Sequence, residues 1–239
     1  YGTQWGGSPA SYYRNLLADN KSRSPRINGA RGEDYVVFLE YINNVNYNFG
    51  GNGGCYGGEN TADITSYNGM NSAHECNFIG NYYKPGPASN KSGVVLVTSS
   101  YARSGATSWG PAKWYVNGNV IEGDANRTAD NWKAMSAEHY SLSDIRVEER
   151  IVPEHNYYKY SKAGNVGTYD PEMYMIYNVE SGEQAYQTVL RTAGTIRRDA
   201  VEKRVVEEAT TGVNLYGGAT YGAKRGIIDT EADREGFRQ

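Results

Sequence analysis

The chain of 239 residues is long enough to bury a substantial core in one or two domains. Its 27 Asp and Glu residues outnumber its 24 Lys and Arg residues, and the net charge of −3 argues against a nucleic-acid-binding protein, which is usually basic. The sequence contains no apolar run of about 18 residues that would predict a membrane-spanning helix, and its first residues lack the charged and apolar regions of a signal peptide.

Short extended segments separated by Gly, Asn, Ser and Pro fill the chain from Asn15 to about Gly123. Val36–Leu39 and Val94–Leu96 are continuous apolar runs, which are typical of strands buried on both faces. Helical periodicity is weak throughout this half. The sequence therefore predicts β structure here.

Asparagines recur around short apolar cores in RNLLADN, INNVNYN, CNFIGNYY and VNGNVIEG. The leading asparagines are Asn15, Asn43, Asn77 and Asn117, at intervals of 28, 34 and 40 residues. Such intervals favour coils of a solenoid with loops of variable length, in which stacked asparagines form hydrogen-bond ladders. A sandwich would show hairpin signals about every 8–12 residues. We predict an all-β fold, a right-handed parallel β-helix forming a partial solenoid.

Two helices are predicted after an irregular, tyrosine-rich stretch over Asp144–Tyr177. A cap at Ser181 begins the first, which runs to Gly194, and Asp199 begins the second, which ends near Gly212. Helices this short are marginal alone, so we expect them to pack on the β-helix or cap its open end. This divides the chain into coils over 1–180 and a helix pair with its tail over 181–239.

The strongest cationic candidates are Arg23 and Arg26, which flank a Ser-Pro pair, followed by Lys21 and Lys84. On a regular strand the two arginines would point to opposite faces, but a turn at the proline could bring both onto one surface. Arginine binds carboxylates bidentately, so such a surface suits an anionic ligand. The alternative is that these cations pair with acids on neighbouring coils.

Two tyrosine-containing stretches, Tyr82–Pro87 and Tyr56–Glu59, are either sugar-facing surfaces or ordinary turns and coil packing. Cys55 and Cys76 could form one disulfide or remain buried thiols. The three histidines lack metal-ligand spacing, and GxSxG, HExxH and Walker motifs do not occur. Carboxylates are scattered, so a glycosidase pair cannot be assigned.

The segment WGGSPASYYRNLLADNKSRSPRING resembles the pectate lyases of polysaccharide lyase family 1, especially the gut-Bacteroidetes type. The resemblance continues through INNVNYNFG, YGGE, NFIGNYYKPGPAS, YVNGNVIEG and GIIDTEAD, and matches the C-terminal part of the family pattern. It implies a right-handed parallel β-helix that cleaves an acidic polysaccharide, polygalacturonate or pectin, by β-elimination. It also implies a secreted, periplasmic or cell-surface location.

The same resemblance implies roles for individual residues. Arg23 begins the RxPR motif and corresponds to the family's catalytic base, and Arg26 to a substrate-binding cation. Asn28 stands where some members carry a further arginine, and we expect it to contact substrate. Tyr83 and Lys84 match the YYKPGP motif and are further substrate-binding candidates.

Calcium (Ca2+) is the cofactor that the resemblance implies. Arginine is ordinarily protonated, and a metal-bound uronate carboxylate would acidify the sugar proton that the base removes. The family's calcium-binding acids lie on coils before the matching segment, so we expect no metal ligands here. We therefore expect this chain to be inactive alone and to need the N-terminal part of the same protein.

Two other functions remain open. A non-catalytic pectin-binding β-helix could use the same cationic groove. A polygalacturonase-like hydrolase could use a related β-helix, although its NTD, DD and GHG motifs do not occur in this sequence.

Overall fold

The structure is a computed structural model that describes residues 2–28, 30–31, 36–50, 54–58, 60–61, 73–90, 96–99, 112–138, 140–153, 175–218, 220, 222, 224–228 and 230. Val94, Val95 and Glu59 lie outside the described residues, as do most of the tyrosine-rich stretch and most of the C-terminal tail.

Three parallel sheets and one strand pair contain all described strands. Sheet A consists of β1 (Gln4–Trp5), β4 (Arg26–Ile27), β8 (Cys55–Gly57), β12 (Val97–Ser99) and β15 (Met135–Ala137). Sheet B consists of β2 (Ala10–Tyr13), β6 (Val36–Ile42), β10 (Ala73–Ile79) and β13 (Lys113–Asn117). Sheet C consists of β3 (Leu16–Ala18), β7 (Val45–Tyr47), β11 (Tyr82–Lys84) and β14 (Val120–Ile121), and the pair is β5 (Ala30–Arg31) with β9 (Asn60–Thr61).

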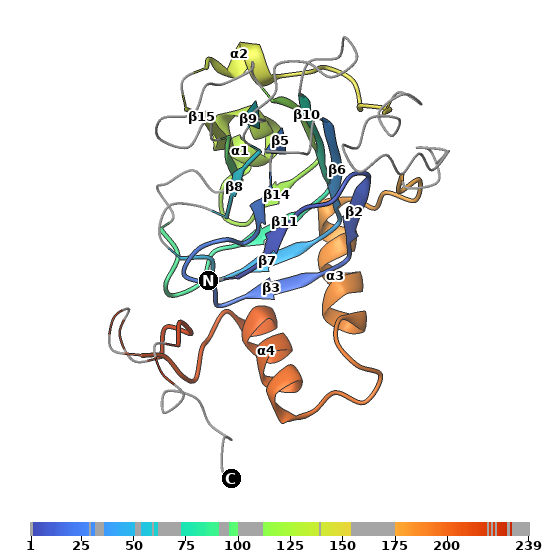
Figure 1. The fold of residues 1–239 in the computed structure, drawn as a ribbon. Coiled ribbons are helices and arrows are strands. Elements are labelled where there is room, and N and C mark those ends of the chain that lie inside the picture. The colour runs from blue at the N-terminus through green and yellow to red at the C-terminus, as the bar shows by residue number, and fades with distance from the viewer. Residues whose placement is uncertain are drawn as a thin grey trace.

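The chain visits these sheets in a fixed order, B then C then A, four times in succession. Each pass lays its strands parallel to those of the pass before (Figure 1). Parallel strands need a long connection, which each coil supplies by passing through the other two sheets. The arrangement is compatible with a parallel β-helix.

Stacked aromatic side chains fill the space between the sheets. In sheet B the in-register partners Tyr41 and Phe78 stack with ring centroids 4.8 Å apart, and Trp114 on the next strand lies 6.3 Å from Phe78. All three are fully buried. Burial of each such ring contributes about 1.5–3 kcal/mol. Cys55 and Cys76 lie in the same core as free thiols, and burial raises the pKa of both.

An asparagine ladder joins successive coils where sheet B turns into sheet C. The side-chain oxygen of each member after the first accepts hydrogen bonds from the backbone and side-chain nitrogens of the member before it, at 2.8–3.2 Å. The last member, Asn131, lies between β14 and β15, in the same coil as Asn119. The members are Asn15, Asn44, Asn81, Asn119 and Asn131.

Of the four leading asparagines whose spacing indicated the coils, Asn15 belongs to the ladder, whereas Asn43, Asn77 and Asn117 do not. The residue immediately before each of the first four ladder asparagines adopts a positive φ: Arg14, Asn43, Gly80 and Gly118. Asparagine and glycine are the residues that enter this conformation most easily. The motif is therefore a left-handed residue followed by asparagine, a pairing that apolar spacing alone does not reveal.

Two short helices connect β14 to β15 within the last coil, and a third follows β15. They are α1 (Ala125–Ala129), the 3-10 helix η1 (Asn131–Ala134) and α2 (Leu142–Ile145). The predicted helix pair is present as α3 (Gly182–Thr192) and α4 (Ala200–Thr211). Ser181 and Asp199 cap their N-termini, each within a capping box, as the sequence predicts.

Helix α3 packs against sheet C, and α4 lies next to its edge strand β3, at the first-coil end of the stack (Figure 1). Leu190 and Ala209 from the helices form one apolar cluster with Tyr47 of β7. A cavity of about 390 Å³ separates α4 from the first coil, with Trp5 and Val205 among its lining residues. No helix in the described part of the chain is long and apolar enough to cross a membrane.

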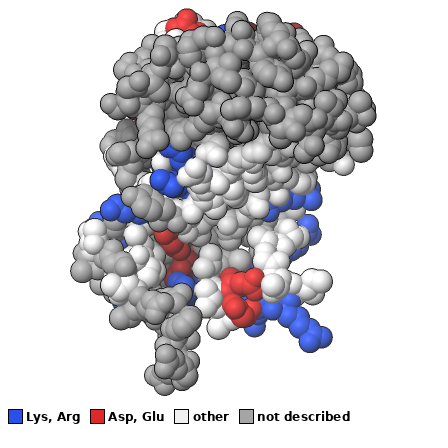
Figure 2. All heavy atoms as spheres, in the orientation of Figure 1, with Lys and Arg blue, Asp and Glu red and all other residues white. Residues whose placement is uncertain are grey.

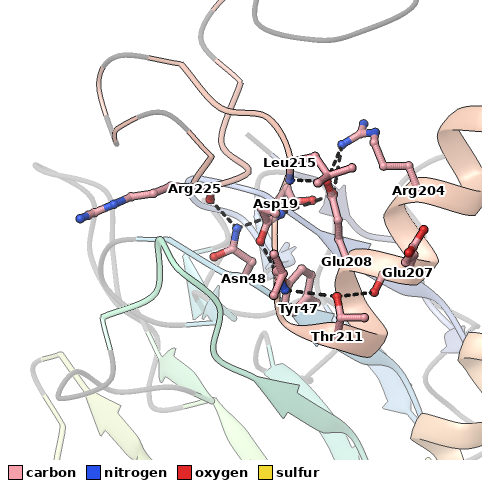
Figure 3. Close-up of polar contacts among 11 residues, drawn as sticks. Asp19, Tyr47, Asn48, Arg204, Glu207, Glu208, Thr211, Leu215 and Arg225 are labelled. Carbon is pink, nitrogen blue, oxygen red and sulfur yellow. Dashed lines mark hydrogen bonds and ion pairs between the residues drawn. The ribbon is translucent and has the colours of Figure 1, made fainter.

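A buried polar cluster fastens α4 to the coils (Figure 3). Asp19, at the turn after β3, accepts hydrogen bonds from Asn48 and Asn214 at 2.6 and 2.8 Å. Glu208 of α4 is 1% exposed and forms an ion pair with Arg204 at 3.0 Å. Burial raises the pKa of Asp19 to about 6, an effect that the nearby Glu208 carboxylate reinforces.

Candidate active site

The candidate site begins at a turn between sheets C and A. Arg23 and Arg26 flank this turn, which Ser24 and Pro25 form. Arg23 has a φ of 66°, in the left-handed region that costs a non-glycine residue about 1–2 kcal/mol. Backbone hydrogen bonds hold the turn, since Thr3 donates to the Arg23 carbonyl and Arg26 donates to the Thr3 carbonyl, both at 2.9 Å.

Strand β4 places Arg26 on the outer face of sheet A. Its neighbour Ile27 is fully buried, and the alternation of a strand turns Arg26 the opposite way. Arg26 is in register with Gln4 of β1 and Tyr56 of β8. Its guanidinium carbon lies 4.9 Å from the centre of the Tyr56 ring, a cation–π contact that supports the charge without neutralising it.

Gln4 connects the predicted residues to one another. Its side-chain oxygen accepts a hydrogen bond from Arg23 Nη1 at 3.1 Å, and its side-chain nitrogen donates to Asn28 Oδ1 at 2.9 Å. Because Gln4 is also the register partner of Arg26, the turn brings both arginines to one face of sheet A. Arg23, Arg26 and Asn28 thus form one group with Gln4 and Tyr56, which we call the arginine face.

Sequence reasoning missed Gln4. Nothing in the segment GTQW marks it as functional, and only the parallel register of β1 with β4 places it beside the arginines. Tyr56 was noted only as part of a stretch open to either interpretation. The signal that would have found both residues is the alignment of coils rather than any local motif.

Tyr83 and Lys84 do not join this group, which corrects our expectation that they contact substrate. Tyr83 is fully buried in the core, with its ring 5.5 Å from Phe49, and has no surface for a polysaccharide. Lys84 turns outward on sheet C but is covered by the helices. Its Nζ donates to the Thr210 carbonyl at 2.8 Å and to the Tyr186 hydroxyl at 3.0 Å. Lys84 therefore fastens α3 and α4 to the coils.

The arginine face does not fit a calcium ion. Calcium takes about six to eight oxygen ligands, many of them carboxylates. The two side-chain amide oxygens of this face, on Gln4 and Asn28, already accept hydrogen bonds, and its two charged members, Arg23 and Arg26, are cations. Elsewhere in the described ranges, no group of three or more His, Cys, Asp or Glu side chains could hold a metal.

Comparison with known proteins gives relatives that share one name. The chain is 31% identical over 135 residues to a probable pectate lyase C of Aspergillus terreus, covering 56% of this chain and 25% of the relative. It is 32% identical over 120 residues to that of Neosartorya fischeri, covering 50% and 22%. The longest of these alignments, to the Aspergillus flavus protein, is 25% identical over 228 residues and covers 95% and 40%.

The chain spans between about a fifth and two fifths of the length of the three relatives. No family model matches the sequence.

Proposed function

We propose that this chain is the arginine-bearing part of a pectate lyase that cleaves polygalacturonate by β-elimination on a right-handed parallel β-helix. The observation that carries the proposal is the arginine face, in which Gln4 joins Arg23 to Asn28 beside Arg26. Similarity to relatives named probable pectate lyase C supports the substrate class. We propose a secreted, periplasmic or cell-surface location for the whole protein.

In the proposed reaction, a base removes the proton from C5 of a galacturonate unit. The electron pair of that C–H bond forms the C4–C5 double bond, the C4–O bond breaks, and the departing oxygen takes up a proton. Water is not consumed and no oxidant is needed. The products are a new chain end and an unsaturated uronate.

Each residue of the arginine face has a proposed part in this step. Arg23 takes the proton as a neutral guanidine, having first released one of its own protons to solvent, and its hydrogen bond to Gln4 holds the group in one orientation. Arg26, supported by the Tyr56 ring, holds the uronate carboxylate and stabilises the negative charge that develops as the proton leaves. Asn28 is oriented by Gln4 and contacts a sugar hydroxyl.

Calcium is part of the proposal as the cofactor that would acidify the C5 proton by binding the uronate carboxylate. The described residues supply no set of ligands for it, so we derive no step through the metal. We propose that its ligands belong to other parts of the whole protein.

The test is to incubate the full-length protein with polygalacturonate in isotopically labelled water, with calcium and with a chelator. We expect ultraviolet-absorbing unsaturated ends without labelled oxygen. Labelled, saturated reducing ends would instead identify a hydrolase. Binding of polygalacturonate without any product at all calcium concentrations would identify a non-catalytic pectin-binding protein. Either result would overturn the proposal.

A further inference from the structure

A group of cations lies on the loop between α3 and α4 and on the adjoining ends of these helices, and it shares no residue with the arginine face. An open depression of about 800 Å³ is lined by Arg191, Arg197, Arg198 and Lys203. Figure 2 shows basic side chains at the lower right, where this loop lies in Figure 1. The whole chain has a net charge of −3, whereas this depression is lined by four cations. We call this group the basic loop.

The acids of the same loop are engaged in capping. Glu202 accepts hydrogen bonds from the Thr195 backbone at 3.0 Å, the Thr195 hydroxyl at 2.8 Å and the Asp199 backbone at 3.1 Å. Asp199 in turn accepts from the Glu202 backbone at 2.8 Å. These bonds fix the start of α4 and hold the loop in one shape, so the depression is preorganised.

The cations divide into one that is fixed and three that face solvent. Arg198 donates to the carbonyls of Leu190 and Ala193 at 2.7 and 3.0 Å, and so closes the end of α3. Arg191, Arg197 and Lys203 are exposed or half-exposed. Within the part of the chain that the structure describes, no ion pair joins these three to an acid.

We propose that the basic loop is an accessory binding surface for the carboxylates of an acidic polysaccharide. The identity of that polymer, polygalacturonate, rests on the proposed function. A single exposed charge contact contributes little, so the loop suits a polymer whose regularly repeated carboxylates engage several cations at once. The arginine face would bind the unit that reacts, and the basic loop would hold a more distant part of the same chain.

An anionic membrane surface is the rival ligand, because Ile196 projects from the loop with its side chain fully exposed. One isoleucine adds little apolar burial, whereas stable membrane anchoring takes more than one such signal. The described loop therefore favours the polysaccharide.

The test measures binding and cleavage separately in the full-length protein. The variant Arg191→Gln/Arg197→Gln/Lys203→Gln is compared with a charge-matched control, Lys113→Gln/Arg127→Gln/Lys133→Gln, on the last coil and the two short helices within it. The three loop residues are exposed, so their substitution leaves folding nearly unchanged. Lys113 and Arg127 of the control are partly buried, so thermal unfolding of both variants checks that each is folded. We expect the loop variant to bind long polygalacturonate about 3- to 100-fold more weakly than the control variant, with unchanged turnover of short oligogalacturonates.

Equal affinity of the two variants for long polygalacturonate would overturn the inference. So would a loop-dependent binding to vesicles of anionic lipid with none to polygalacturonate. If unsaturated products are absent but the loop variant still loses affinity for the polymer, the proposed lyase function fails and the binding surface stands.

Discussion

The asparagine ladder makes a sharp prediction at Asn81, its central member. The Asn81 side chain accepts from the backbone and side-chain nitrogens of Asn44 at 2.8 and 3.2 Å. It donates to the Tyr41 carbonyl at 3.0 Å and to Asn119 Oδ1 at 2.8 Å. Asn81→Ala removes all four hydrogen bonds and leaves the Asn44 backbone N–H without its acceptor.

The expected loss of stability in Asn81→Ala follows from these contacts. A typical hydrogen bond contributes about 1 kcal/mol net, and a buried donor left unpaired costs about 1–3 kcal/mol. Asn119 Oδ1 loses only one of its two hydrogen bonds from residue 81, because the backbone N–H of that residue still donates to it. We expect Asn81→Ala to lower the free energy of unfolding by about 3–5 kcal/mol.

The matched control is Asn117→Ala, two residues before the next ladder position. Asn117 is exposed, and its side chain donates one hydrogen bond, to the Tyr115 hydroxyl at 3.0 Å. Surface changes of this kind stay within about 0.5 kcal/mol. Urea unfolding followed by circular dichroism measures both variants. If Asn81→Ala is no more destabilising than Asn117→Ala, the ladder does not hold the coils together as described.

Three further predictions concern pH, the helices and the close packing of sheet A. The raised pKa of Asp19, about 6, means that the folded state binds this proton more tightly than the unfolded chain. Its contribution to stability therefore falls by about 2 kcal/mol as pH rises from 4 to 7. The asparagine of Asp19→Asn does not ionise, so the free energy of unfolding of the variant should rise by this amount relative to wild type between pH 4 and pH 7, as measured by unfolding curves at both pH values. A difference between variant and wild type that is equal at both pH values would contradict the prediction. The comparison with wild type cancels the opposite effect of His74, whose pKa burial lowers to about 3. Lys84→Met should lower the free energy of unfolding by about 1–3 kcal/mol, because it removes the hydrogen bonds to α3 and α4, and should leave KM for polygalacturonate unchanged. A raised KM at unchanged stability would instead identify Lys84 as a substrate-binding residue. Gly57→Ala should cost more than about 3 kcal/mol in thermal unfolding, since φ is 124° and a Cβ would collide with the Ile27 carbonyl oxygen; a neutral effect would contradict this register.

The β character of the first half and the helix pair could be predicted from sequence because their signals are local. Apolar runs mark β6, and a Ser or Asp cap followed three residues later by Gln or Glu marks α3 and α4. Ladder positions were harder, since they depend on a left-handed residue before each asparagine, and that conformation is taken by arginine, asparagine or glycine.

The candidate site was predicted in part. The paired arginines follow from their spacing about a proline, and the turn brings them to one face. Gln4 could not be found because its role comes from strand register with a segment 22 residues away. Tyr83 and Lys84 were misjudged because a single motif places its residues on alternating faces of β11, one in the core and one under the helices.

The central claim is that Arg23 removes a proton from bound galacturonate, and Arg23→Lys in the full-length protein tests it most directly. Ultraviolet absorbance of unsaturated products measures the rate on polygalacturonate, with Arg127→Lys as a control for the same change of side chain elsewhere. Removal of a group that transfers a proton in the transition state lowers the reaction rate about 100- to 10,000-fold. We predict a loss of that size for Arg23→Lys, with the fold and the control rate unchanged. An Arg23→Lys enzyme as fast as Arg127→Lys would contradict the claim.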